Sequence, residues 1–129
     1  MKKKISILGS TGSIGLNTLS IIDKKRHFFN IILLSSNKNY KLICKQIKNY
    51  KPEYYVIKDF KTFKKVKKKF KKSETKIFNF FKFENKKFKS EITISAIPGI
   101  AGLEPTINII KHTKKILIAN KEAIICGWS

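Results

Sequence analysis

Near the start of the chain stands Lys4-Ile-Ser-Ile-Leu-Gly9-Ser-Thr-Gly12-Ser-Ile-Gly15, an apolar strand that runs into three evenly spaced glycines. Gly9 permits a sharp turn out of the strand, Gly12 lets the main chain approach a phosphate, and Gly15 lets the next helix pack closely on the sheet. The unpaired amides and the positive dipole end of that helix would face the anion. The spacing G-x-x-G-x-x-G is a variant of the dinucleotide fingerprint, and its place between a strand and a helix predicts a nucleotide site rather than an ordinary glycine turn.

Short apolar strands alternate with helical patterns along the rest of the chain. We expect strands at 4–8, 30–34, 54–57, 76–78, 91–96 and 115–119, and helices at 13–24, 40–50, 60–73 and 103–112. The first helix is expected to bury Ile14, Leu19 and Ile22, and the second Leu42, Ile43 and Ile47. This order predicts an α/β fold, a doubly wound parallel sheet of the Rossmann-like kind, in one domain over residues 1–129 that is the front part of a longer protein.

The chain has a formal net charge of +21, yet Arg26 is its sole arginine. The lysines come with many Ile, Asn, Phe and Tyr, residues with AT-rich codons, so base composition accounts for much of this charge. A nucleic-acid reader more often keeps arginines for bidentate contacts. We therefore expect a solvated lysine surface, no nucleic-acid partner, and core positions for the phenylalanines of segment 60–89; a module that binds single-stranded nucleic acid is the alternative.

Three features of the sequence bear on where the protein works. Cys44 and Cys126 are far apart, which favours reduced thiols over a disulfide framework. The glycines interrupt the apolar stretch after the opening lysines, which argues against a signal peptide. No apolar run approaches the roughly 20 residues of a membrane span. We expect a cytoplasmic protein without a membrane partner.

In an open parallel sheet, ligands bind beyond the carboxyl ends of the strands. Four loops are expected to converge there, at residues 9–15, 35–39, 96–102 and 120–122. The second loop, Ser35-Ser-Asn-Lys38-Asn, lacks the carboxylate that usually accepts hydrogen bonds from the ribose of NAD. A cation and small polar groups suit a 2′-phosphate, so NADP is favoured over NAD. The alternative is that Lys38 is one more lysine of a lysine-rich chain.

Together these motifs resemble the amino-terminal cofactor domain of the 1-deoxy-D-xylulose 5-phosphate reductoisomerase family. The resemblance is carried by the glycine stretch, by Asn37-Lys-Asn39, by Ala96-Ile-Pro-Gly-Ile-Ala-Gly-Leu103, and by Ala119-Asn-Lys-Glu122. It implies an NADPH-dependent enzyme that rearranges and reduces 1-deoxy-D-xylulose 5-phosphate to 2-C-methyl-D-erythritol 4-phosphate in the non-mevalonate isoprenoid pathway.

The resemblance also implies roles for individual residues. The cofactor phosphates would be bound by Thr11, Gly12, Ser13 and Ile14, the 2′-phosphate by Asn37, Lys38 and Asn39, the nicotinamide half by Asn120 and Glu122, and the substrate by Lys121. The loop 97–102 would form the floor beneath the nicotinamide.

The metal site of the family is expected outside this chain. The resemblance implies a divalent ion, magnesium or manganese, on acidic residues that follow residue 129, and a homodimer that acts on a small phosphosugar. The acids here show no paired spacing for a hard cation, and His27 and His112 are solitary at expected helix ends. We assign no catalytic or metal residue and expect the fragment alone to be inactive. The alternatives are another NADP-dependent dehydrogenase, which would need a nucleophilic Cys or a Tyr-x-x-x-Lys pair, and the basic nucleic-acid module.

Overall fold

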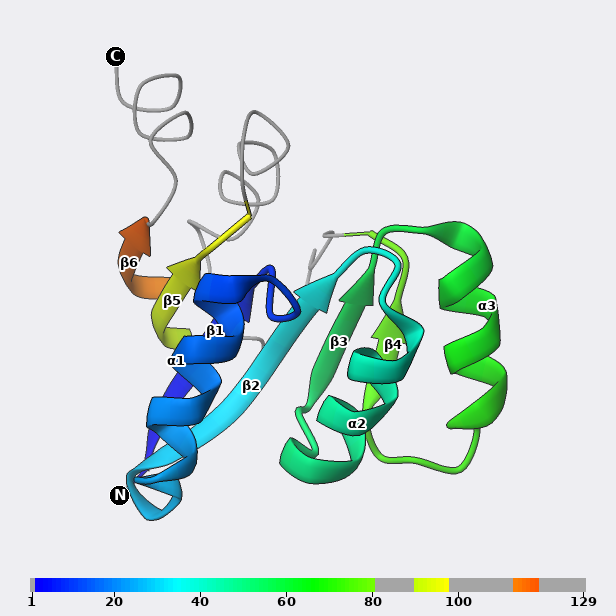
Figure 1. Cartoon of the computed structure of the whole chain (residues 1–129). Coiled ribbons are helices and arrows are strands. Elements are labelled where there is room, and N and C mark those ends of the chain that lie inside the picture. The colour runs from blue at the N-terminus through cyan, green and yellow to red at the C-terminus, as the bar shows by residue number, and fades with distance from the viewer. Residues whose placement is uncertain (1, 81–89, 98–112, 119–129) are drawn as a thin grey trace.

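A six-stranded sheet forms the frame of the molecule (Figure 1). The computed structural model describes residues 2–80, 90–97 and 113–118. The strands are β1 (Lys3–Leu8), β2 (Phe29–Ser36), β3 (Tyr54–Ile57), β4 (Lys76–Phe78), β5 (Ser90–Ser95) and β6 (Thr113–Ile118). Every pair of neighbouring strands runs parallel, in the order β4-β3-β2-β1-β5-β6. Because the first four strands step outward in one direction and β5 returns to the other side of β1, the order reverses between β1 and β5. That reversal is the place where open α/β sheets bind ligands.

The helices follow the strands in turn. They are α1 (Ser13–Asp23), the short 3-10 helix η1 (Arg26–Phe28), α2 (Tyr40–Tyr50) and α3 (Phe60–Lys69). Asn39 and Asp59 cap the amino ends of α2 and α3 with their side chains. Lys51 ends α2 in the left-handed conformation with φ 46°, and Pro52 follows it. Figure 1 shows α1 and α2 over the same face of the sheet, with α3 at the side of β4.

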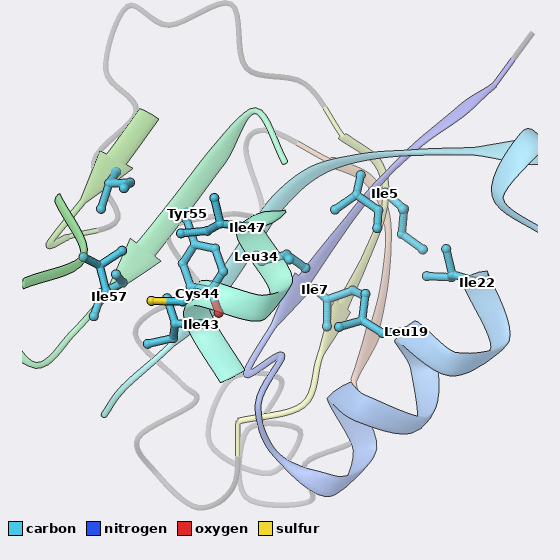
Figure 2. Packing of buried hydrophobic residues seen from close by; sticks show 13 residues of the cluster. Ile5, Ile7, Leu19, Ile22, Leu34, Ile43, Cys44, Ile47, Tyr55 and Ile57 are labelled. Atoms are coloured by element: carbon cyan, nitrogen blue, oxygen red, sulfur yellow. The ribbon is translucent and has the colours of Figure 1, made fainter. Parts of the chain in front are cut away.

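One apolar cluster joins the three helices to the sheet. Leu19 and Ile22 come from α1, Ile43 and Ile47 from α2, and Val66 from α3, and they pack on strand residues of that face (Figure 2). On the opposite face lies a second cluster, made of Leu8, Ile32, Leu33, Tyr54 and Val56 with Phe78 and Ile97 against it. Strands with apolar groups on both faces are the mark of a buried parallel sheet.

The predicted α/β Rossmann-like fold is confirmed, with differences at the ends of elements. β2 continues through Ser35 and Ser36, which the sequence analysis placed in a loop, because Ser35 and Ser36 still pair with Val56 and Ile57 of β3. The third helix ends at Lys69 rather than near residue 73. The predicted helix 103–112 lies outside the described residues.

Some expected core positions are wrong. Ile14 has 43% of its surface exposed, because the first turn of α1 buries Gly15 instead. In segment 60–89, Phe63 and Phe70 pack against the first cluster as expected, but Phe60 and Phe80 are 58% and 53% exposed.

Lysine ammonium groups lie over two aromatic rings on α3. The ammonium of Lys64 lies 5.4 Å from the ring centre of Phe60, and that of Lys67 lies 5.4 Å from Phe63. Both pairs are four residues apart, the spacing that brings side chains together on a helix. Contacts between lysine and phenylalanine side chains within α3 therefore explain part of the sequence pattern of this segment.

Two further observations concern expected locations and thiols. Among the described residues, the helices are too short or too polar for any of them to cross a bilayer. Cys44 is a buried free thiol on α2, and Cys126 lies outside the described residues.

Candidate nucleotide-binding site

The glycine turn leaves β1 at the reversal of strand order. Gly9 has φ +79°, a conformation that glycine adopts without strain. A Cβ at this position would lie 3.0 Å from the backbone of Ala96 and Ile97, just beyond β5. Gly9 is thus required twice, by its backbone angle and by the close approach of the two chain segments.

Gly15 and Gly12 differ in what surrounds them. A Cβ on Gly15 would overlap the carbonyl oxygen of Gly9 and lie 2.7 Å from the Cα of Ser10. Gly15 therefore lets the first turn of the helix pack against the glycine turn that follows β1. Among the described residues, a Cβ on Gly12 would meet only the Gly9 carbonyl, at 3.7 Å. The described part of the chain therefore leaves the space beside Gly12 open, and a ligand would fit there.

The amino end of α1 presents backbone donors to that space. The first hydrogen bond of the helix runs from the Leu16 amide to the Gly12 carbonyl at 2.8 Å. The amides of Ser13, Ile14 and Gly15 precede it and have no intrahelical acceptor. Gly12 caps the helix without a side-chain bond, and the first turn holds no acid. This end of the helix is electropositive and uncapped, which fits a phosphate group.

The second predicted loop lies beside this turn because β2 neighbours β1. Asn37, Lys38 and Asn39 are all exposed and follow directly after β2. The Oδ1 atom of Asn39 accepts a hydrogen bond from the Leu42 amide at 3.2 Å, so this side chain caps α2. The amide nitrogens of Asn37 and Asn39 and the ammonium of Lys38 are the side-chain donors that this loop offers to a ligand.

A carboxylate from the neighbouring strand acts on this loop electrostatically. Asp59 follows β3, and its Oδ2 atom accepts hydrogen bonds from the Thr62 hydroxyl at 2.7 Å and the Thr62 amide at 3.1 Å. These bonds, with a smaller contribution from the charge of Lys38, hold the pKa of the Asp59 carboxyl below its usual range. The Asp59 carboxylate caps α3, and Lys38 is the charged group of the loop that follows β2.

A buried polar cluster lies beneath the glycine turn. It consists of Ser10, Ser35, Ser36, Gln46 and Tyr55, which come from the turn, the end of β2, α2 and β3. The sequence analysis missed Gln46 and Tyr55 as parts of the site. The available signal was the position of Gln46 on α2, three residues after Ile43 and next to Ile47, where a polar residue falls on the buried helix face.

The remaining predicted site residues are only partly covered. Ala96 and Ile97 lie against Gly9, as expected for the third loop. Asn120, Lys121 and Glu122, and most of the loop 97–102, lie outside the described residues. In the described segments, no three side chains of the His, Cys, Asp and Glu types gather as a metal site would require. His27 lies in η1 with its ring centre 4.1 Å from that of Phe28.

A cavity of about 630 Å³ lies at the opposite end of the strands. Its walls include Asn30 and Ile31 at the start of β2, Glu53 just before β3, and Thr75 just before β4. These residues mark the amino ends of the strands, whereas nucleotides bind at the carboxyl ends. We therefore place the candidate site at the glycine turn and not in this cavity.

Comparisons with known proteins point to one family. The family model for 1-deoxy-D-xylulose 5-phosphate reductoisomerase matches residues 5–127. This chain belongs to that family. The reductoisomerase of Pelagibacter ubique is 47% identical over 131 residues, which cover 98% of this chain and 34% of the relative. The chain thus spans about a third of the length of the curated relatives it matches.

Two solved members of the reductoisomerase family share the fold. The Zymomonas mobilis enzyme in complex with NADPH superposes with a TM-score of 0.85 at 27% identity, over 97% of this chain and 34% of that one. A reductoisomerase in complex with NADPH, fosmidomycin and magnesium gives a TM-score of 0.82 at 25% identity, over 95% of this chain and 31% of that one.

The different surroundings of the glycines predict different effects of adding a methyl group. Gly15→Ala should lower the free energy of unfolding by about 1–3 kcal/mol or more, because the methyl overlaps the Gly9 carbonyl. Gly12→Ala should cost less than about 1 kcal/mol, because its methyl enters open space. Urea unfolding of both variants measures the difference. Equal losses would contradict the arrangement of the turn.

Alkaline pH should weaken the fold through Tyr55. Burial raises the pKa of its hydroxyl to about 12, so the neutral form contributes stability that is complete below about pH 10 and is lost as the pH rises through the folded value. The Tyr55→Phe variant lacks this group and should lose less stability over the same interval. Urea unfolding of the two proteins from pH 9 upward gives the comparison. Parallel curves would show that the Tyr55 hydroxyl is not buried.

Proposed function

We propose that this chain is the NADPH-binding domain, over residues 1–129, of a 1-deoxy-D-xylulose 5-phosphate reductoisomerase. The observation that carries the proposal is the open space beside Gly12, bordered by the unpaired amides of α1 at the reversal of strand order. None of the described residues fills that space. A diphosphate supplies the negative charge and acceptor oxygens that this end of the helix lacks.

The two described loops divide the contacts with the cofactor. Thr11, Gly12, Ser13 and Ile14 are proposed to bind the pyrophosphate, chiefly through backbone amides. Asn37, Lys38 and Asn39 are proposed to bind the adenosine 2′-phosphate, with Lys38 supplying the charge. Support comes from their exposure at the end of β2 and from the use of the Asn39 Oδ1 atom as a cap, which directs its NH₂ group elsewhere.

The contacts with the nicotinamide half of the cofactor are proposed only from the sequence motif and from membership of the reductoisomerase family. Asn120 and Glu122 would hold this half of the cofactor, and Lys121 would bind an oxyanion or phosphate of the substrate. When bound, NADPH supplies the hydride for the reduction. The loop that begins at Ile97 would lie beneath the ring, since Ile97 already contacts the glycine turn.

The proposed activity is that of the complete enzyme, of which this chain would be one part. The complete enzyme would rearrange and reduce 1-deoxy-D-xylulose 5-phosphate to 2-C-methyl-D-erythritol 4-phosphate, as a cytoplasmic homodimer with magnesium or manganese. The metal ligands would come from the two thirds of the relatives that this chain does not span. The chain alone would bind cofactor without turnover.

The lysine-rich surface of α3 is not part of the proposed site. α3 covers the β4 side of the sheet, away from the reversal between β1 and β5. Its lysines should give only weak, salt-sensitive attraction to polyanions. Titration of a single-stranded oligonucleotide at rising salt tests this expectation. Binding that persists at about 0.2 M salt would favour a nucleic-acid function instead.

Cofactor titrations of the purified chain test the proposal directly. NADPH should bind more tightly than NADH. Gly12→Ala should weaken both by about tenfold or more, because its methyl occupies the phosphate space. Lys38→Glu should weaken NADPH by about tenfold and NADH far less, because only NADPH carries the 2′-phosphate. Isothermal titration or nicotinamide fluorescence gives both dissociation constants.

Lys65→Glu is the matched control. Lys65 is exposed on α3, and its reversal changes the net charge by the same amount as Lys38→Glu. It should shift both affinities equally and slightly. Equal affinity of the unmodified chain for NADPH and NADH, or equal losses in the Lys38→Glu variant, would contradict the assignment of the second loop.

A further inference from the structure

Hydrogen bonds connect the residues of the buried polar cluster beneath the glycine turn. Gln46 reaches from α2 to the turn with both ends of its amide. Its Nε2 atom donates to the Ser10 carbonyl at 2.9 Å, and its Oε1 atom accepts from the Ser10 hydroxyl at 2.7 Å. Gln46 has 3% of its surface exposed and Ser10 none. The Gln46 side chain thus holds Ser10 by two hydrogen bonds, one at its carbonyl and one at its hydroxyl.

Tyr55 completes the cluster from β3. Its hydroxyl donates to Gln46 Oε1 at 2.8 Å and lies 3.2 Å from the hydroxyls of Ser10 and Ser36. Since the tyrosine proton goes to Gln46, the hydroxyl of Ser36 can donate to Tyr55 in turn. Figure 2 shows the Tyr55 ring among the apolar residues of the first cluster, near Ile43, Cys44 and Ile47 of α2. Burial keeps the Tyr55 phenol neutral far above neutral pH, so this donor persists.

The connected residues adjoin both cofactor loops. Ser10 lies in the glycine turn directly before Thr11, and Ser36 directly precedes Asn37. The turn is further fixed by the amides of Gly9 and Ser10, which donate to the Ser35 carbonyl at 3.0 and 2.7 Å. The Tyr55 hydroxyl is therefore the point where the pyrophosphate turn and the start of the 2′-phosphate loop meet in the protein interior.

We propose that Gln46 and Tyr55 are positioning residues, which fix the glycine turn and the start of the second loop in one geometry for the nucleotide without touching it. The inference rests on the proposed function, because it concerns the same site. A buried network whose members are all satisfied gives a rigid local structure. A loop that is already held in its bound conformation binds its ligand more tightly, because less free energy is spent on ordering it.

The competing explanation is that the network only stabilises the fold. A purely stabilising pair would lower the free energy of unfolding and leave the affinity of the folded protein unchanged. The chain offers a matched control for this effect. The hydroxyl of Thr75 is also buried and donates to the Pro52 carbonyl at 2.6 Å, but it lies at the amino edge of the sheet. Thr75→Val removes one buried hydrogen bond far from the cofactor loops.

Three variants separate the two explanations. Gln46→Leu removes both bonds to Ser10 at nearly constant volume, and Tyr55→Phe removes only the hydroxyl. NADPH dissociation constants are measured for each folded variant, below its unfolding midpoint. Gln46→Leu should weaken NADPH by about tenfold or more and Tyr55→Phe by about threefold to tenfold, whereas Thr75→Val should leave it unchanged. If Gln46→Leu does not fold, Tyr55→Phe with the Thr75→Val control still decides the case.

A second measurement needs no cofactor. Amide hydrogen exchange of Ser10 in the nucleotide-free chain should accelerate in Gln46→Leu and Tyr55→Phe, relative to the amides of the central strand β1. Unchanged exchange at Ser10 would overturn the claim that the pair holds the turn. Faster exchange with NADPH affinity equal to that of Thr75→Val would overturn the positioning role. Loss of NADPH binding by the unmodified chain would instead refute the proposed function, while the exchange result would stand on its own.

Discussion

The arrangement of the site depends on one carbonyl group at the end of β2. The Ser35 carbonyl accepts two backbone hydrogen bonds, from the amides of Gly9 and Ser10. These bonds bring the chain that leaves β1 across the end of β2 before α1 begins (Figure 1). They hold the turn in which Gly9 has its positive φ and against which Gly15 packs.

From that anchor, the three glycines take different parts. Gly9 and Gly15 serve the protein, because each occupies a place where a methyl group would collide with backbone. Nothing in the described structure fills the space beside Gly12, which supports its proposed place against the cofactor phosphates. The same motif would then contain two residues required for folding and one required for binding. The buried cluster of Ser10, Gln46 and Tyr55 lies beneath the turn and also supports it through hydrogen bonds.

The sequence predicted the fold well because strand and helix patterns in this chain agree with each other. The bounds of α2, β3 and β4 were predicted as observed, and the glycine motif located the turn. The errors have physical causes that local patterns do not contain. Ser35 and Ser36 look like loop residues until their pairing with β3 is known. Phe60 looks like a core residue from its spacing, but it is 58% exposed and has the Lys64 ammonium over its ring. Gln46 and Tyr55 were missed because their roles depend on contacts between segments far apart in the chain.

The central claim is that the amino end of α1 binds the cofactor phosphates through its own amides. Backbone amide chemical shifts of the chain during a titration with NADPH test this most directly. The account predicts the largest changes at Ser13, Ile14 and Gly15, followed by Asn37 to Asn39, with small changes on α3. Changes that centre on the lysines of α3, or that leave the first turn of α1 unaffected at saturation, would contradict it.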